Sequence, residues 1–449
     1  MRIKLSDTFS TKKLLQYAMP SILMMVFISV YSVVDGFFVG LFVGSKGLAA
    51  VNIVFPLIMA ISSFGFMLGA GGSAEVARKL GEGKGQTAKE YFTMLTIATS
   101  LVGILLSLLC LNYIRPICYL MGASDLIIED CVVYGKICLA GNVFFTLQAF
   151  FQSLLVTAER PGMGFALSIV SGITNMLLDW LFIGVLHMGL AGAALATTAG
   201  FIIGSLVPLF YFMSAKPVQL HFVKPVWDLK VLLRSMGNGS SEMVTNISRS
   251  LIALLFNIQL MSLMGEDGVA AISVMLYVEF VFTAVLIGFS MGTAPVIGFN
   301  FGARRGDQLK TIFHSCLRIV VIVSAGMFVI SQLAAPGLIA IFIHNDPQLL
   351  QITVTGFRLF AISFLASGIN IFASSYFTAL CNGRVSAIIS LMRTLILQSI
   401  LILVLPLIIG INGIWIALPL AEILTLGLSF WYFYKNQAVF ESLTVKADG

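Results

Sequence analysis

Long apolar stretches separated by short polar breaks fill the chain from Leu14 to about Phe433. A membrane-spanning helix needs about 20 mostly apolar residues, and the chain contains twelve such stretches. We predict spans at residues 14–41, 48–73, 91–113, 131–156, 163–186, 190–213, 236–263, 269–297, 312–336, 356–380, 386–408 and 413–434. The pattern predicts an all-α polytopic membrane protein.

Composition strengthens this prediction. Of the 449 residues, 59% are hydrophobic and 10% are charged, with a mean hydropathy of +1.01, which lies far outside the range of soluble globular domains. The apolar stretch after the basic N-terminus continues to about Leu41 without a small-residue cleavage site, so we interpret it as a retained first span.

The distribution of positive charge predicts the orientation. Basic residues gather in the N-terminal tail and in the even-numbered loops: Arg2, Lys4, Lys12, Lys13, Arg78, Lys79, Lys84, Lys89, Arg160, Lys216, Lys224, Lys230, Arg234, Arg304, Arg305, Lys310 and Arg384. The opposite loops hold mainly acids. Because Lys and Arg favour the cytoplasmic side, we predict a bacterial inner-membrane protein with both termini cytoplasmic. The net charge of +6 therefore sets orientation and indicates no nucleic-acid partner.

The chain repeats itself at a shift of 221 residues (268 minus 47). The shift places these residues on one another: Gly47, Ala49 and Ala50 on Gly268, Ala270 and Ala271; Gly81 and Gly85 on Gly302 and Gly306; Phe92 on Phe313; Thr157, Ala158 and Gly162 on Thr378, Ala379 and Gly383; Gly189, Gly192, Tyr211 and Phe212 on Gly410, Gly413, Tyr432 and Phe433. One register over so long a stretch favours a true duplication over chance coincidence of glycines.

Each repeat holds six spans, an even number, so both copies cross the membrane in the same direction. We predict an N-lobe at residues 1–213, a basic cytoplasmic linker at 214–234 that contains Pro217 and Pro225, and a C-lobe at 235–449. Two bundles that face one another have the geometry of alternating access, and one chain is sufficient to form it. We therefore expect a functional monomer.

Three polar residues in different spans reach one depth. Asp35 lies about eight residues before the outer end of the first span, Asp179 a similar distance before that of the fifth, and Thr197 about seven residues into the sixth. Asn175 precedes Asp179 by four residues and shares its helix face. Charged groups inside a bilayer are costly, so this cluster is a candidate functional site.

Two carboxylates, an amide and a hydroxyl at one depth can bind a proton or Na⁺. Two neighbouring carboxylates in a medium of low dielectric constant cannot both ionise cheaply, which favours cation binding between them. We therefore predict a coupling site at Asp35, Asn175, Asp179 and Thr197. The alternative is a static hydrogen-bonded network that only joins the three helices.

Five further charged residues inside predicted spans are candidates for a cavity or a buried pair. Glu279 and Arg249 lie near mid-membrane in adjacent spans, and Glu422 and Arg393 lie in the last two, so each pair can form either a buried ion pair or part of a cavity wall. Glu242 lies at the predicted start of the seventh span, where the helix dipole alone can stabilise a carboxylate.

Nothing in the sequence indicates a cofactor. The six cysteines form no CxxC pair, and the four histidines are scattered, so we predict no metal. The glycine-rich loop around Lys84 lacks the GxxxxGK[ST] pattern, so we predict no ATP site. Uphill transport would then depend on a gradient of H⁺ or Na⁺.

Four segments resemble one known family. They are MPSILMMVFISVYSVVDGFFVG from Met19, GLAAVNIVFPL from Gly47, the loop ending ARKLGEGKG, and NMLLDWLFI from Asn175. The chain is similar over its whole length to the multidrug and toxic compound extrusion (MATE) family, and most to its MepA-type and DinF-type branch. The resemblance implies two six-helix lobes in a V-shaped arrangement and antiport of organic, often cationic, drugs against H⁺ or Na⁺.

The resemblance also implies which residues form the ion sites of the two lobes. The family's N-lobe cation or proton site maps onto Asp35, Asn175, Asp179 and Thr197, the residues that the depth argument selects. The carboxylate site in the second lobe of the NorM-type branch has no clear counterpart, because the tenth span offers Asn370 and no acid.

Two other functions compete with drug efflux. A flippase or exporter of a lipid-linked saccharide or another dedicated metabolite shares the architecture, although the intramembrane acids here outnumber the arginines. A membrane-embedded enzyme is disfavoured, because the spans contain no HExxH and no nucleophile with a base at helical spacing. We expect a transporter of small organic substrates that is not an enzyme.

Overall fold

The computed structural model describes residues 3–214, 219–343 and 346–436, without the side chains of Phe37 and Ser45. Within these ranges the chain is helical and forms no strand. Twelve helices are long and apolar enough to cross a membrane, and they coincide with the twelve predicted spans. The predictions of an all-α fold and of twelve spans are therefore confirmed.

The first half begins with three long helices, followed by a short helix at the outer end and three more spans. The helices are α1 Thr11–Phe42, α2 Ser45–Gly81, α3 Gly85–Asn112, α4 Ile114–Leu120, α5 Ile128–Thr157, α6 Pro161–Asp179 with its π-helical continuation η1 Trp180–Val185, and α7 Gly189–Met213. α2 extends eight residues beyond its predicted end, because hydropathy detects only the apolar part of a helix and misses turns such as the one holding Arg78 and Lys79.

The second half repeats this order with two interrupted spans. Its helices are α8 Leu229–Met264, α9 Glu266–Gly302, α10 Gly306–Ala340, α11 Pro347–Phe360, η2 Ala361–Ser363, α12 Phe364–Ala379, α13 Gly383–Leu391, η3 Met392–Ile396, α14 Leu397–Ile409 and α15 Ile411–Lys435. The tenth span consists of α11, η2 and α12, and the eleventh of α13, η3 and α14. Residues 229–234 of the predicted linker form the first turns of α8, and residues 215–218 lie outside the described ranges.

Side-chain caps explain where several helices begin. Asp228 accepts hydrogen bonds from the backbone N–H groups of Lys230 and Val231 at 3.0 and 3.2 Å, and so starts α8. Asp346 caps α11 in the same way. Both caps lie just outside apolar segments, where the first N–H groups of a helix need acceptors.

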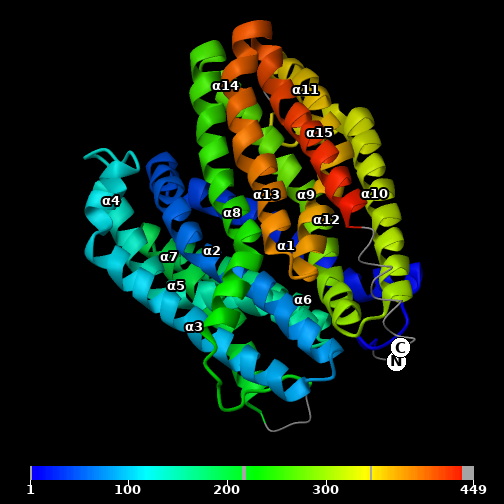
Figure 1. The fold of residues 1–449 in the computed structure, drawn as a ribbon. Coiled ribbons are helices and arrows are strands. Elements are labelled where there is room, and N and C mark those ends of the chain that lie inside the picture. The colour runs from blue at the N-terminus through cyan, green and yellow to red at the C-terminus, as the bar shows by residue number, and fades with distance from the viewer. Residues whose placement is uncertain (1–2, 215–218, 344–345, 437–449) are drawn as a thin grey trace.

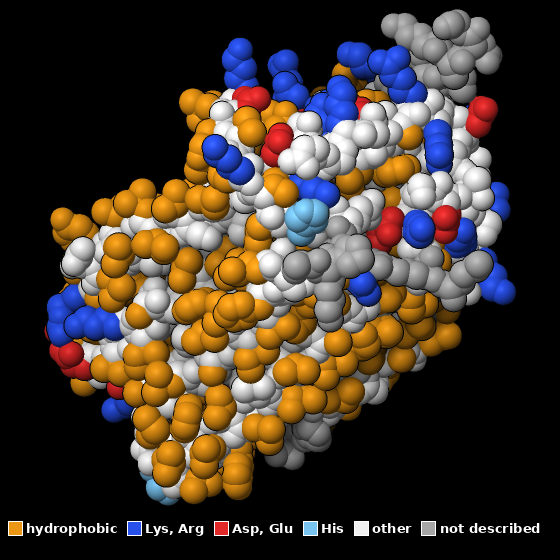
Figure 2. Space-filling model, turned by 90° about the horizontal axis from the view of Figure 1, so that it is seen from below, with side chains coloured by type: hydrophobic (Ala, Val, Ile, Leu, Met, Phe, Trp, Pro, Cys, Tyr) orange, Lys and Arg blue, Asp and Glu red, His pale blue; other side chains and the backbone are white. Residues whose placement is uncertain are grey.

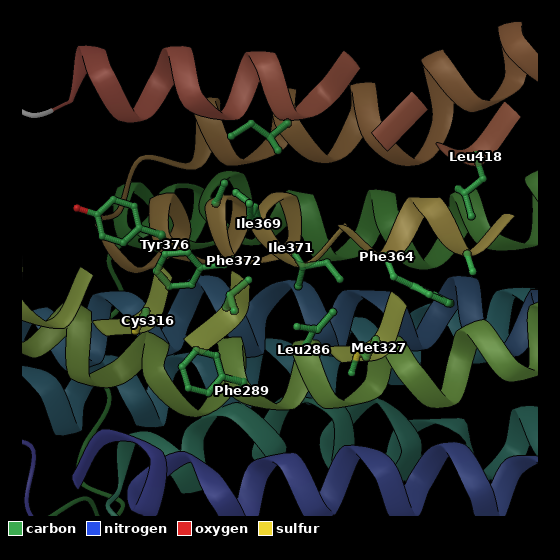
Figure 3. Packing of buried hydrophobic residues seen from close by; sticks show 14 of the residues in the cluster. Leu286, Phe289, Cys316, Met327, Phe364, Ile369, Ile371, Phe372, Tyr376 and Leu418 are labelled. Atoms are coloured by element: carbon green, nitrogen blue, oxygen red, sulfur yellow. The ribbon is translucent and has the colours of Figure 1, made fainter. Parts of the chain in front are cut away.

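The helices form two bundles that diverge towards one end (Figure 1). In the first, α5 packs against α2, α3 and α7, and in the second, α12 packs against α9, α10, α13 and α15. The core of the second bundle is aromatic: Phe313 lies 5.0 Å from Tyr376 between ring centroids and 5.1 Å from Phe433. Figure 3 shows Phe289, Phe364 and Phe372 filling the space between the helices of this core.

Glycines bring the two bundles together at the C-terminal ends of α2 and α9. A side chain at Gly81 would collide with the backbone oxygen of Phe299, and one at Gly302 would collide with that of Arg78. The 221-residue shift relates one contact to the other, since 81 plus 221 is 302 and 78 plus 221 is 299. The lobes therefore meet across a pseudo-twofold axis, as a parallel repeat requires.

The outer surface of the bundles suits a bilayer. Many large apolar side chains are exposed on the outward faces of the helices, including Leu407 at 85% and Leu333 at 78%. Figure 2 shows hydrophobic side chains covering a broad flank, with Lys and Arg side chains towards its margins. An uninterrupted apolar flank of this kind is favourable against lipid and not against water.

Candidate functional site

The structure brings the four predicted N-lobe residues together. Asp35 comes from α1, Asn175 and Asp179 from successive turns of α6, and Thr197 from α7. Asn175 and Asp179 are fully buried, and Thr197 is 7% exposed. The Asn175 amide donates a hydrogen bond to the Thr197 hydroxyl at 3.4 Å. The helical spacing used in the sequence analysis therefore describes one shared site between three helices.

The two carboxyl groups of this site face one another. The Asp35 carboxyl lies within hydrogen-bonding reach of the Asp179 carboxyl and the Asn175 side chain. Both carboxyl oxygens of Asp179 and the amide oxygen of Asn175 are buried, and no N–H or O–H group of the described residues donates to them. Three acceptors without a donor form an incomplete site, because buried oxygens of this kind need a proton or a cation.

The local structure of α6 positions these groups. Ser171, one turn before Asn175, donates a hydrogen bond to the backbone oxygen of Gly200 at 2.6 Å and joins α6 to α7. A side chain at Gly200 would press on Ser171, so the glycine permits the close approach. The π-helix η1 begins directly after Asp179. Segments of π-helix are frequent at functional sites, where they change the direction of side chains.

Sequence reasoning missed two aromatic residues beside the aspartates. Tyr31 precedes Asp35 by one helical turn. Its hydroxyl lies close enough to Asp35 and Asp179 to interact electrostatically with both. Tyr134 of α5 is 3% exposed and also lies near Asp35. The spacing of Tyr31 and Asp35 could have identified the first, but no pattern in the sequence places α5 beside α1.

The second bundle contains its own buried polar cluster. Arg393 of η3 forms an ion pair with Glu422 of α15 at 2.8 Å, as the sequence analysis allowed. The Asn370 amide donates to the second Glu422 oxygen at 2.7 Å, and the Ser429 hydroxyl donates to the Asn370 oxygen at 2.8 Å. Asn370 therefore binds an acid, Glu422, that another helix contributes. A search for acids within the span of Asn370 does not detect it.

The structure corrects the position of Glu242 and excludes one of the two alternatives for Arg249 and Glu279. Glu242 is not at a helix start, because α8 begins at Leu229, 13 residues earlier (242 minus 229), so the helix dipole does not account for it. Arg249 and Glu279 form no ion pair. The Arg249 guanidinium instead lies 5.0 Å from the centre of the Phe280 ring.

The residues present suit a proton or Na⁺ better than a transition metal. Within the described ranges no group of three or more His, Cys, Asp or Glu side chains could hold a metal ion, and His344 lies outside those ranges. Asp35, Asp179, Asn175 and Thr197 offer only oxygen ligands to a cation, the kind that hard ions such as Na⁺ prefer.

Two six-helix bundles, duplicated in parallel and each with a buried polar cluster, define a multi-pass membrane transporter. The MatE family model matches the chain at residues 20–181 and again at 241–424. The chain therefore belongs to the MatE family. The two matches begin 221 residues apart (241 minus 20), the shift found in the sequence, so the internal repeat is confirmed.

Curated relatives match nearly the full chain. A multidrug export protein MepA from Staphylococcus haemolyticus is 23% identical over 94% of this chain and 93% of its own length. An FAD transporter from Shewanella oneidensis is 24% identical over 94% of this chain and 94% of its own length. These relatives are transporters, so the family is one of transporters and not of enzymes.

Solved structures share the fold. A MATE protein in complex with MaL6 has a TM-score of 0.91 at 20% identity and covers 97% of this chain and 98% of its own. An outward-facing multidrug resistance MATE family transporter of the MOP superfamily has a TM-score of 0.90, also at 20% identity, with the same coverage of both chains. The V-shaped two-lobe fold expected from the sequence is therefore confirmed.

Proposed function

We propose that this protein is a secondary active antiporter that exports organic, mainly cationic, drugs or metabolites in exchange for H⁺ or Na⁺. Family membership supports transport of small molecules across a membrane. The proposal adds the coupling ion, the class of substrate and the role of four residues: Asp35, Asn175, Asp179 and Thr197.

The facing carboxyl groups of Asp35 and Asp179 carry the proposal. Because no N–H group of the described residues donates to Asp179, the two carboxylates repel one another unless a proton or a cation lies between them. A bound cation neutralises this site in one stage of the cycle. Its release leaves negative charge that favours a cationic substrate, so the two ligands exclude each other, as antiport requires.

The contacts between the bundles support alternating access. The lobes are packed through Gly81 and Gly302 at the cytoplasmic end and diverge towards the other end (Figure 1). Opening towards the cytoplasm would require these glycine contacts to separate while the outer ends approach. Two rigid bundles related by a pseudo-twofold axis suit such a rocking motion.

The relatives support two candidate substrate classes. The MepA proteins are named for multidrug export, which favours a range of drugs, whereas the Shewanella relative is named for FAD, a dedicated metabolite. We favour drug export because the N-lobe cluster is acidic and suits cations. A dedicated exporter, including a flippase for a lipid-linked saccharide, is the second candidate.

Efflux of ethidium from drug-hypersensitive cells under an imposed pH or Na⁺ gradient tests the proposal. We expect one gradient to drive efflux in the wild type and Asp35→Asn or Asp179→Asn to abolish it at matched expression. Asp125→Asn, in an exposed loop, is the control and should keep efflux. Normal efflux in both site variants would make the cluster structural, and absence of wild-type efflux would favour the dedicated exporter.

The orientation belongs to the same proposal. We place both termini in the cytoplasm of a bacterial inner membrane because the basic end of α2 and the arginines that follow α9 lie on the side that holds the N-terminal segment. Arg305 donates a hydrogen bond to the Ser6 backbone oxygen at 2.8 Å on that side. Fusion of alkaline phosphatase to the C-terminus should give an inactive enzyme, and an active fusion would reverse the orientation.

A further inference from the structure

Three charged side chains in the C-lobe lack an ion-pair partner. Glu242 and Arg249 come from α8 and Glu279 from α9. Within the described ranges, no ion pair joins the carboxyl groups of Glu242 and Glu279 or the Arg249 guanidinium to another side chain, and the Glu279 carboxyl lies within hydrogen-bonding reach of the Thr283 hydroxyl of its own helix. All three are partly exposed although they lie within membrane-spanning helices. Unpaired charges at this depth are costly and indicate a ligand.

These charges converge in one place. The positive charges of Arg393 and Arg249 both act on Glu242 and on Glu279, although the residues come from α8, α9 and η3. Arg393 is already neutralised by Glu422 at 2.8 Å. One guanidinium and two carboxyl groups without an ion-pair partner therefore remain where α8 packs against α9 and η3.

The free charges of α8 lie on the face that meets the other lobe. Gly239 packs against the Met67 backbone of α2. Glu242 and Arg249 follow Gly239 by three and ten residues, which places them on the same side of the helix. They follow the glycine contact along α8, on the way from its N-terminal end to its C-terminal end. The charged groups of α8 therefore face the region between the lobes and not the lipid.

The internal repeat relates this group to the N-lobe site. Subtracting 221 places Arg249 at position 28 and Arg393 at position 172, each seven residues before an N-lobe aspartate, Asp35 or Asp179. Seven residues are nearly two helical turns, so the arginines occupy the same faces of the equivalent helices about 10 Å closer to the cytoplasm. On equivalent helix faces, the N-lobe thus carries the two aspartates and the C-lobe carries the two arginines, at different depths.

We propose that Glu242, Arg249 and Glu279 form a substrate subsite for zwitterions, in which Arg249 binds a carboxylate or phosphate group and the two glutamates bind the cationic group. The proposal rests on the transport function above and deepens it. Guanidinium groups bind carboxylates and phosphates through paired N–H donors, and the Phe280 ring beside Arg249 offers a surface for a flat organic ligand.

Two dyes that differ by one ester group test the subsite. Rhodamine 110 carries a carboxylate and a cationic ring system, whereas rhodamine 123 is its methyl ester and is only cationic. Fluorescence polarisation of each dye with the purified full-length protein gives its Kd. We expect Arg249→Gln to raise the Kd of rhodamine 110 about tenfold, as loss of a charge-assisted contact does, and to change that of rhodamine 123 less than about twofold.

Companion variants separate recognition from folding. Arg249→Lys keeps the charge and should restore much of the rhodamine 110 affinity, and the double variant Glu242→Gln with Glu279→Gln should weaken both dyes. Arg318→Gln, an exposed arginine of α10, is the matched control and should change neither Kd. Gradient-driven ethidium efflux should persist in Arg318→Gln and is measured apart from the two Kd values, which separates this test from that of the N-lobe coupling site.

Three outcomes would overturn the subsite. An equal change in both Kd values would make Arg249 a structural residue. No change in either Kd would remove it from substrate contact. Failure of the wild type to bind rhodamine 110, whether or not it binds rhodamine 123, would show that the region does not accept a zwitterion, even if ethidium efflux and its dependence on Asp35 remain intact.

Discussion

Two buried acids of this protein, Glu422 and Asp179, differ in whether the protein donates hydrogen bonds to them. Glu422 is held completely, by the Arg393 guanidinium at one oxygen and the Asn370 amide at the other. Asp179 has the same depth of burial but no donor to either oxygen among the described residues. A satisfied acid stabilises the fold, whereas an unsatisfied one retains affinity for a proton or a cation. We therefore assign Glu422 a structural role and Asp179 a functional one.

The structural role of Glu422 leads to a stability prediction. Arg393→Met leaves Glu422 buried at 2% exposure without its cation and should cost about 3 kcal/mol, measured as a lower apparent Tm of the purified protein. The double variant Arg393→Met with Glu422→Leu removes both charges and should recover most of the loss. Equal Tm values for the single variant and the wild type would show that the pair adds nothing to stability.

Individual site residues differ in how far the sequence could reveal them. Asn175 and Asp179 are one turn apart on one helix, so spacing alone predicted their shared face. Glu242 was misplaced because hydropathy hides the polar first turns of α8, which hold Lys230 and Arg234. The contact of Asn370 with Glu422 joins residues 52 apart in the chain, and only tertiary structure reveals it.

At the scale of helices, small residues decide where the lobes meet. Gly81 and Gly302 each lie against the backbone of the opposite lobe, and the repeat makes the two contacts equivalent. Close backbone packing of this kind drives association of helices in a membrane. The hydrophobic effect does not drive it, because lipid tails are as apolar as the helix surfaces. The close packing of the lobes at this end therefore depends on the absence of Cβ atoms at these positions.

A pair of glycine substitutions tests this contact. Gly302→Ala places a methyl group against the Arg78 backbone and should lower the apparent Tm and slow efflux. Gly326→Ala in α10 meets open space and should leave the Tm unchanged or raise it slightly, since alanine favours a helix over glycine by up to about 1 kcal/mol. Equal shifts in the two variants would show that the interface tolerates a side chain at Gly302.

For the whole molecule, an ionic contact joins the lobes beside these glycines. Glu75 of α2 is fully buried and contacts Arg78 of its own helix at 2.7 Å and Arg234 of α8 at 3.5 Å. Cys381, in the turn after α12, lies close enough to sense the same charges. Burial raises the pKa of the Cys381 thiol to about 12, so the thiol is protonated and unreactive while the cytoplasmic end is closed.

Labelling of Cys381 reports this closure. In a variant that keeps Cys381 as its single cysteine, Glu75→Gln should loosen the contact with Arg234 and speed maleimide labelling several-fold at pH 7. Exposure lowers the thiol pKa towards about 8.5 and so increases the reactive thiolate. Glu90→Gln on α3, whose carboxyl accepts a hydrogen bond from Gln86 at 3.3 Å, is the control. Unchanged labelling in Glu75→Gln would exclude Glu75 from the closed contact.

The large-scale organisation was largely predictable because the membrane restricts it. Twelve apolar stretches and the 221-residue repeat predicted the number of spans and the duplicated fold. The interruptions at η2 and η3 and the lengths of the helices beyond the apolar core were not predictable, because they depend on packing between spans. The conformation closed at the cytoplasmic end likewise has no signature in one sequence.

The central claim is that the ion and the substrate exclude one another through the Asp35 and Asp179 pair. Its most direct test is the Kd of ethidium for the purified protein, measured across pH and Na⁺ concentration. We predict that the wild-type Kd rises by up to about tenfold per unit fall in pH, or with added Na⁺, and that Asp179→Asn abolishes this dependence. A wild-type Kd independent of both ions, or an unchanged dependence in Asp179→Asn, would contradict the account.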